Sequence, residues 1–80
     1  MYHVYILRSI NYPELTYVGY TLNIQERLKT HNAGGSIHTA THKPWELVMF
    51  LTFHDEKRAR EFEHYLKTQS GRAFLSKRFL

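Results

Sequence analysis

Two short stretches near the N-terminus, HVYIL (His3–Leu7) and TYVGYT (Thr16–Thr21), decide the fold of this 80-residue chain. Both are rich in β-branched and aromatic residues, and the residues between them have the composition of a turn, so we expect a β-hairpin. No Asn-Gly or Asp-Gly pair is present, which excludes the commonest two-residue loops. One possible register has Ser9 to Pro13 as the loop and places Tyr5 opposite Tyr17. Both hydroxyls would then lie on one face of the sheet.

A helix is expected to follow the hairpin. Asn23 has the side chain of an N-cap residue, and Glu26 three positions later can complete a capping box. Gly34 and Gly35 are typical of a helix end, so we expect the helix to finish after Asn32.

One stripe of this helix contains both apolar and ionisable residues. Ile24, Arg27, Leu28 and His31 recur at the i, i+3, i+4, i+7 spacing of a single helix face. The face that a helix turns toward the rest of a protein is usually apolar, so the two polar members are candidates for function.

The middle of the chain predicts a loop and then a strand. Ser36 to Lys43 is polar and is expected to be an exposed loop. Its His38 and His42, even with His31, make a poor zinc site because no fourth ligand has a fitting spacing. Glu46 to Phe53 follows as a mostly apolar run, typical of a largely buried strand.

The C-terminal part predicts two helices. Asp55 is a good N-cap for a helix that runs to about Gln69, with Gly71 beyond its end. Arg72 to Leu80 then forms a short terminal helix. The side chains expected to point inward are Ala59, Phe62, Leu66, Phe74 and Phe79.

These elements predict an α+β fold. Their order is ββαβαα, and a three-stranded, mainly antiparallel sheet flanked by helices follows from one hairpin and one later strand. Eighty residues are expected to form one domain, spanning 1–80. The chain has no Cys, which excludes disulfides and a thiolate zinc site, and it has no apolar run of about 20 residues. We expect a cytoplasmic protein, monomeric by default, with no membrane contact.

The charge of the chain favours a polyanionic partner. There are 11 Lys and Arg against 7 Asp and Glu, which gives a formal net charge of +4. The basic residues are spread over helices and loops rather than beside a lipid-seeking segment, so nucleic acid is the expected partner.

Five ionisable residues on or beside apolar faces could form an active site. A carboxylate such as Glu63 can hold Mg²⁺, and Arg27 can neutralise the charge that develops on a phosphate. Tyr5, Tyr17 or His31 can take a proton from water. Together these are the groups needed for metal-assisted attack on a phosphodiester.

The two tyrosines have a simpler interpretation. Aromatic residues on neighbouring strands commonly pack against each other without any chemical role. Gly19 argues for more than packing, because a Gly inside a strand often marks the close approach of a ligand or another backbone.

The other three candidates also have structural alternatives. Arg27 could lay its stem over apolar neighbours, and His31 could complement the helix dipole. Glu63 could form an i, i+4 ion pair with Lys67. What favours function is that five chemically compatible residues occur in order across about 60 positions, from Tyr5 to Glu63.

In their order and spacing these residues resemble the GIY-YIG nuclease superfamily. HVY (His3–Tyr5) stands where the family has its first tripeptide and YVG (Tyr17–Gly19) where it has its second, followed by Arg27, His31 and Glu63. The similarity is greatest to small stand-alone bacterial members. The sequence also resembles the catalytic subunit of junction endonucleases, but it lacks the Cys-rich zinc module of that subunit.

The resemblance implies a metal-dependent endonuclease that hydrolyses DNA in repair or recombination. Glu63 would bind Mg²⁺ or Mn²⁺, Arg27 would contact the scissile phosphate, and Tyr5, Tyr17 and His31 would handle protons. Further substrate contacts are expected from Gly19, Asn23, Lys43 and Arg72.

The sequence departs from the family in ways that keep two alternatives open. His3 replaces the first Gly of the motif, and Tyr20 stands where the excision-repair branch has a Lys that could stabilise a phenolate. We expect none of the DNA-binding domains that many relatives carry, so a protein partner could supply specificity. The chain could therefore be a nucleic-acid-binding module, or a nuclease subunit with little activity alone.

Overall fold

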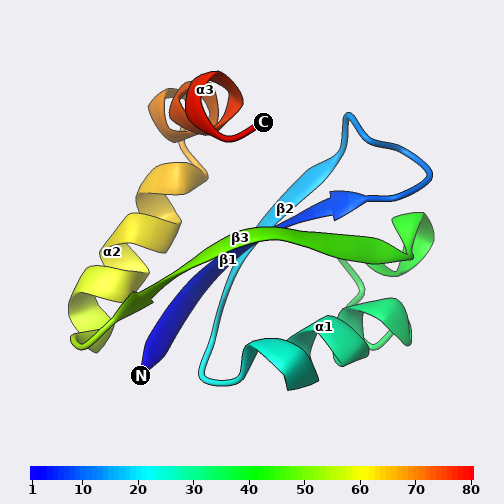
Figure 1. Ribbon diagram of the computed structural model, residues 1–80, viewed down its shortest axis with the longest axis horizontal. Helices are drawn as coiled ribbons and strands as arrows, with labels where there is room; N and C mark the ends of the chain where they lie inside the picture. The colour runs from blue at the N-terminus through cyan, green and yellow to red at the C-terminus, as the bar shows by residue number, and fades with distance from the viewer.

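The structure is a computed structural model that describes residues 1–80 (Figure 1). The elements are β1 (Tyr2–Ser9), β2 (Thr16–Thr21), α1 (Ile24–Asn32), the 3₁₀ turn η1 (Ala40–His42), β3 (Trp45–Phe53), α2 (Glu56–Leu66) and α3 (Gln69–Arg78). The predicted α+β class and the order ββαβαα are confirmed. None of the helices is both long enough and apolar enough to cross a membrane.

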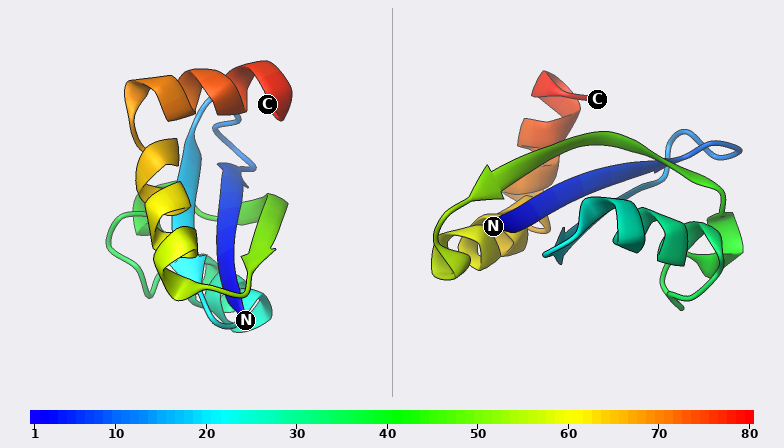
Figure 2. Two further views of the ribbon diagram at one scale, coloured as in Figure 1. Left: turned by 90° about the vertical axis from the view of Figure 1, so that its left-hand side faces the viewer. Right: turned by 60° about the horizontal axis from the view of Figure 1, so that its bottom comes forward.

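The three strands form one antiparallel sheet in the order β2-β1-β3. β1 is the central strand, and its alternating side chains feed two separate cores. Val4 and Ile6 pack against α2 and α3, whereas Tyr5 and Leu7 pack on the other face, beneath α1. Figures 1 and 2 show α1 on one side of the sheet and the pair α2 and α3 on the other.

The register of the hairpin, which the sequence left open, differs by two residues from the possible one given above. Tyr5 lies opposite Gly19, and Tyr17 lies opposite Leu7. The possible register with Ser9 to Pro13 as the loop is not formed, because the connection takes up residues 10–15 and closes with a turn in which the Leu15 N–H donates to the carbonyl of Tyr12 at 2.8 Å. A shift of two residues preserves the sheet face, so Tyr5 and Tyr17 still share one surface, as diagonal neighbours.

The third strand is less buried than its composition suggested. It starts one residue earlier than predicted, at the buried Trp45, but Phe50 is 46% exposed and Leu51 is 39% exposed. β3 is an edge strand, and the helices cover only part of it. The prediction of a largely buried strand was wrong because an apolar run does not distinguish a central strand from an edge strand.

The boundary between the last two helices also differs from the prediction. α2 ends at Leu66, and Thr68 caps a new helix by accepting from the Gly71 N–H at 3.1 Å. Gly71 therefore lies inside α3, where a Cβ would collide with the carbonyl of Tyr65. Its role is a close helix-to-helix approach rather than a helix end.

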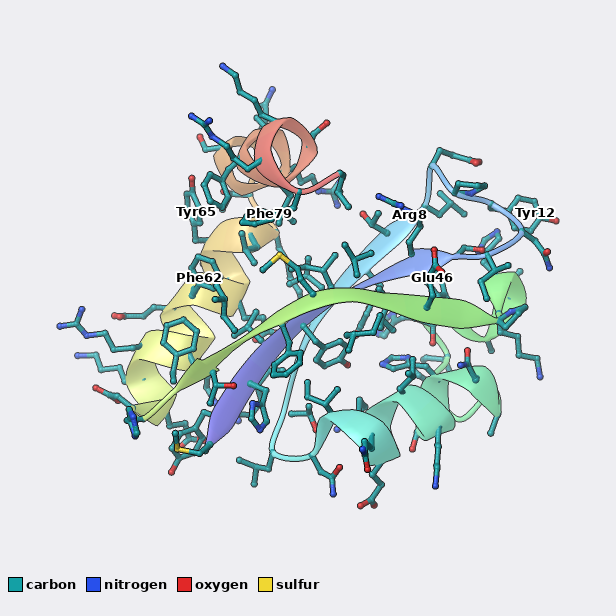
Figure 3. The ribbon with its side chains drawn as sticks, in the orientation of Figure 1. Arg8, Tyr12, Glu46, Phe62, Tyr65 and Phe79 are labelled. Atoms are coloured by element: carbon teal, nitrogen blue, oxygen red, sulfur yellow. The ribbon has the colours of Figure 1, made fainter.

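The inward face of α3 was predicted only in part. Leu75 is its buried apolar side chain, at 3% exposure, whereas Phe79 is 46% exposed. Phe79 contacts Phe74 with ring centroids 5.8 Å apart, which continues a row of aromatic rings from Phe62 and Tyr65 (Figure 3).

Candidate active site

Three aromatic rings meet between the sheet and α1. The phenol oxygen of Tyr5 lies 2.8 Å from Nε2 of His31, and both residues are buried. The ring of Tyr17 is centred 5.1 Å from the His31 ring and 6.4 Å from that of Tyr5. Because Tyr17 is only half-buried, it connects this buried pair with the surface.

The sequence of α1 explains how His31 is placed. The side chain of Asn23 accepts from the Glu26 N–H at 3.1 Å, as the cap prediction required. The reciprocal half of the capping box is absent, because the Asn23 N–H donates to Thr21 Oγ1 instead. Ile24 and Leu28 then pack on the Tyr5 core, and His31, one turn further on, is directed into it at 1% exposure.

Gly19 makes room for Tyr5. A Cβ on Gly19 would collide with the phenol oxygen and ring of Tyr5, which lies opposite it in the hairpin. The Tyr5 side chain therefore fills the space that the missing Cβ of Gly19 leaves.

A residue that the sequence analysis missed completes the buried cluster. Thr39 was predicted to lie in an exposed loop, but it is fully buried, and its Oγ1 lies 2.6 Å from Nδ1 of His31. Both ring nitrogens of His31 therefore contact hydroxyls, and the ring is not free to join His38 and His42 around zinc. No sequence signal identifies Thr39, since a Thr in a polar segment has no periodic pattern to mark it as buried.

Burial and neighbouring charges shift two pKa values in this cluster. The pKa of Tyr5 is raised, first by burial and then by Tyr17 and Glu63, while Arg27 opposes the shift. The pKa of His31 is lowered, first by burial and then by the positive charge of Arg27. Both shifts favour the uncharged forms, so the resting pair is a neutral phenol and a neutral imidazole.

Glu63 is near the cluster, but its carboxylate has a partner. It accepts from Lys67 Nζ at 3.0 Å, with 19% of its side chain exposed. The ion pair considered as the structural alternative is therefore formed. Lys67 Nζ also lies 5.9 Å from the centre of the Tyr17 ring, which places the pair beside the cluster.

The residues around Glu63 suit Mg²⁺ or Mn²⁺ better than zinc. No group of three or more His, Cys, Asp or Glu side chains could hold a metal together. Structural zinc sites need four such ligands. Mg²⁺ and Mn²⁺ favour oxygen ligands, and Mg²⁺ is commonly bound by one or two carboxylates plus water and substrate phosphates, which Glu63 alone can support.

The surface has two hollows, and residues of β2 line both of them. The larger, of about 1030 Å³, lies between the hairpin and the C-terminal helices, and Tyr17, Lys67, Arg72 and Arg8 contribute to its lining. Figure 3 shows Arg8 at the hairpin end of β1. The hollow also includes one carboxylate, Glu14.

The smaller hollow, of about 570 Å³, lies at the start of α1. Its polar lining includes Asn23, Arg27 and Arg60. Of the expected substrate contacts, Asn23 and Arg72 thus line hollows, one in each. Lys43 lines neither of them and lies beside Gly34 instead.

Tyr20, at the position that carries Lys in the excision-repair branch, contacts two side chains of α2. The hydroxyl of Tyr20 donates to Glu56 at 3.0 Å, and the guanidinium of Arg60 lies 4.1 Å from the centre of the Tyr20 ring. A cation is therefore present in this region, supplied by α2 rather than by β2.

Comparison with known proteins identifies the family of the chain. The chain matches the model of the GIY-YIG catalytic domain over residues 1–77. It is 38% identical over 68 residues to the UPF0213 protein CPE1444 of Clostridium perfringens, covering 84% of this chain and 71% of that protein. It is similar in structure to the UPF0213 protein BH0048 of Bacillus halodurans, solved in solution by NMR, with a TM-score of 0.57 and 28% identity over 96% of this chain and 84% of that chain.

A eukaryotic relative is also similar. The structure-specific endonuclease subunit SLX1 of Debaryomyces hansenii is 38% identical over 73 residues, which are 82% of this chain and 21% of the yeast protein. The chain thus spans about a fifth of the yeast subunit. The resemblance found in the sequence motifs is confirmed, and the chain belongs to the GIY-YIG catalytic-domain family.

Proposed function

We propose that this protein is a GIY-YIG endonuclease that hydrolyses phosphodiester bonds in DNA. The observation that carries the proposal is the buried hydrogen bond between Tyr5 and His31, with Tyr17 leading from it to the surface. Buried tyrosines and histidines are common, but here Arg27 and Glu63 lie close enough for their charges to act on Tyr5. Proton-handling groups, a cation and a carboxylate therefore occur at one place.

The proton chemistry follows from the two neutral rings. A phenol whose pKa is raised is not a phenolate at neutral pH, so Tyr5 cannot act as a preformed base. His31 Nε2 can accept the proton of Tyr5 as Tyr5 takes one from the attacking water. In this relay Tyr5 stays neutral, and the positive charge appears on His31.

The remaining candidates act on the phosphate. Arg27 is exposed and lines the smaller hollow, where its guanidinium can pair with phosphate oxygens. Glu63 would hold Mg²⁺ or Mn²⁺, which would stabilise negative charge on the phosphate and the leaving oxygen. Lys67 contacts only one of the two carboxylate oxygens, Oε2, and its positive charge disfavours a second cation there, so it competes with the ion for Glu63.

The positions of the two hollows favour a binding path for a strand of nucleic acid along β2. Arg8, Lys67 and Arg72 line one hollow, Arg27 and Arg60 line the other, and residues of β2 line both. Each phosphate that meets such a cation releases counterions, which makes binding favourable at low salt. Because the yeast relative is a structure-specific endonuclease subunit, we extend the proposal to branched DNA as substrate and to a role in repair or recombination.

One observation favours a second function, a nucleic-acid-binding module with little turnover. The carboxylate that would bind the metal is already paired with Lys67. If that pair stays closed, the cationic hollows would still bind nucleic acid while hydrolysis would fail, unless a partner protein opens the site.

A cleavage assay with matched variants separates the two functions. We would incubate purified protein with supercoiled plasmid and with a labelled branched duplex, in Mg²⁺, Mn²⁺ or EDTA. The test variants are Glu63→Gln and Arg27→Ala. The controls are Glu61→Gln and Lys29→Ala, which remove the same kind of side chain from exposed positions of the same helices.

The expected result is metal-dependent cleavage that both test variants lose and both controls keep. Binding without cleavage in every metal would support the module. Cleavage that persists in Glu63→Gln and in EDTA would contradict the proposed site, because no metal-bound carboxylate would then be needed.

A further inference from the structure

Thr39 is fixed at the centre of the segment between α1 and β3. Its N–H donates to the Ser36 carbonyl at 3.2 Å, and its own carbonyl accepts from Nε1 of the buried Trp45 at 2.8 Å. The residue is fully buried. The hydroxyl therefore has little freedom to leave the ring of His31, 2.6 Å away.

Thr39, His31 and Tyr5 form a linear chain of three hydrogen-bonded groups. Thr39 Oγ1 contacts Nδ1 of His31, and Nε2 of the same ring contacts the phenol oxygen of Tyr5. No buried side-chain nitrogen or oxygen atom in the protein lacks a hydrogen-bond partner. A neutral imidazole has one donor and one acceptor nitrogen, so the two hydroxyls together determine which nitrogen carries the proton.

The acidities of the two hydroxyls indicate which group donates in each of the two hydrogen bonds. A phenol is a much stronger acid than an alkyl alcohol and is the better donor, whereas the alcohol is the better acceptor. The favoured arrangement has Tyr5 donating to Nε2 and Nδ1–H donating to Thr39. When Nε2 gains a proton, Nδ1–H keeps the same acceptor, so the imidazolium forms without reorientation.

We propose that Thr39 is the positioning residue of the site, holding His31 in the Nδ1–H tautomer so that its Nε2 lone pair faces Tyr5. The tautomer is a property of the folded protein and does not depend on catalysis. The effect on rate rests on the proposed nuclease function. Thr39 does not touch substrate and acts only through His31.

The tautomer can be measured by NMR on the whole protein, labelled with ¹⁵N at histidine. Correlations between the ring nitrogens and ring protons distinguish Nδ1–H from Nε2–H, and the variant His31→Gln identifies which signal belongs to His31. We expect Nδ1–H in the unaltered protein. A ring protonated at Nε2 would overturn the proposal without need of any Thr39 variant.

Variants at Thr39 test whether its hydroxyl determines the tautomer of His31. Thr39→Val keeps the shape but removes the acceptor, so the Nδ1–H population of His31 should fall, and Thr39→Ser should retain it. Thr41→Val, the same change at an exposed position of the same segment, is the control and should leave the tautomer as it was. An unchanged tautomer in folded Thr39→Val would overturn the proposal.

Cleavage provides the second readout. Thr39→Val should lower kcat by about tenfold or more with little change in KM, and Thr39→Ser should recover most of the loss. A loss confined to KM would contradict positioning of a proton carrier. If the unaltered protein shows the Nδ1–H tautomer but cleaves nothing, the proposed function fails, while the assignment of Thr39 to His31 stands.

Discussion

At the scale of single residues, Gly19 is a position that has no room for a side chain. Its Cβ position is occupied by the phenol of Tyr5, so Gly19→Ala must push that ring away from His31. We expect a loss of about 1–3 kcal/mol in the free energy of unfolding, as for overpacked cores, and a loss of cleavage activity. Urea denaturation measures the first effect and plasmid nicking the second.

A control for this change lies on the same strand. Thr16→Ala alters an exposed position of β2 and should leave stability within about 0.5 kcal/mol. If Gly19→Ala behaved like Thr16→Ala, the close contact between Gly19 and Tyr5 would be wrong.

The lowered pKa of His31 predicts a pH dependence of stability. Its folded pKa lies below the ordinary value of 6.5, so between those two values the unfolded chain binds a proton that the folded protein does not. Stability should therefore rise with pH across this window, by at most about 1.4 kcal/mol per pH unit. His31→Gln should lack this part of the rise.

The measurement is urea denaturation from about pH 5 to pH 8 for both proteins, compared by slope so that carboxylate titration cancels. His38→Gln is a suitable control because His38 is exposed. Equal slopes in the unaltered protein and His31→Gln would show that burial does not disfavour the charged imidazole.

At the scale of elements, the side chain of Asn32 joins the end of α1 to the start of β3. Its amide donates to the Trp45 carbonyl at 3.1 Å and its oxygen accepts from the Trp45 N–H at 2.6 Å. Asn32→Ala should lower the free energy of unfolding by about 1–2 kcal/mol, since two hydrogen bonds are lost. Trp45 is the only tryptophan, so its fluorescence should shift to longer wavelength as the indole becomes wetter.

Asn11→Ala is the matched control for this junction, because Asn11 is exposed in the hairpin loop. It should change neither stability nor fluorescence. A fluorescence spectrum of Asn32→Ala identical to that of the unaltered protein would show that the edge strand is held by other contacts.

The elements also show what the sequence could predict. Caps at Asn23 and Asp55 were identifiable because each is a local interaction between a side chain and a nearby N–H. The hairpin register and the exposure of β3 depend on loop conformation and on where distant helices pack, and no local pattern encodes them. Thr39 is the extreme case, since only its tertiary contacts distinguish it from the exposed Thr41.

The candidate site was predictable to a similar extent. The family resemblance implied that Tyr5, Tyr17 and His31 act together, and their rings do meet. The two interpretations of Glu63 could not be separated from sequence, because an i, i+4 ion pair with Lys67 and nearness to Tyr5 are compatible on one helix face. The ion pair and metal binding are therefore competing uses of one carboxylate, and the metal dependence of cleavage distinguishes them.

At the scale of the whole molecule, the net charge of +4 matters less than where the cations lie. Arg72 and Lys77 both belong to α3 and both are exposed, but only Arg72 lines the hollow next to Tyr17. Arg72→Glu and Lys77→Glu change the net charge equally. A difference between them therefore reports position and not total charge.

Binding of a labelled duplex, measured by fluorescence anisotropy in EDTA from about 50 to 200 mM salt, tests this expectation. If Arg72 contacts one phosphate, Arg72→Glu should make the slope of log K against log salt shallower by about one, and Lys77→Glu should change it little. Equal effects of the two variants would mean that DNA is attracted by net charge alone. The hollow between the hairpin and α3 would then no longer mark the path of the substrate, even if cleavage at the Tyr5 and His31 cluster were established.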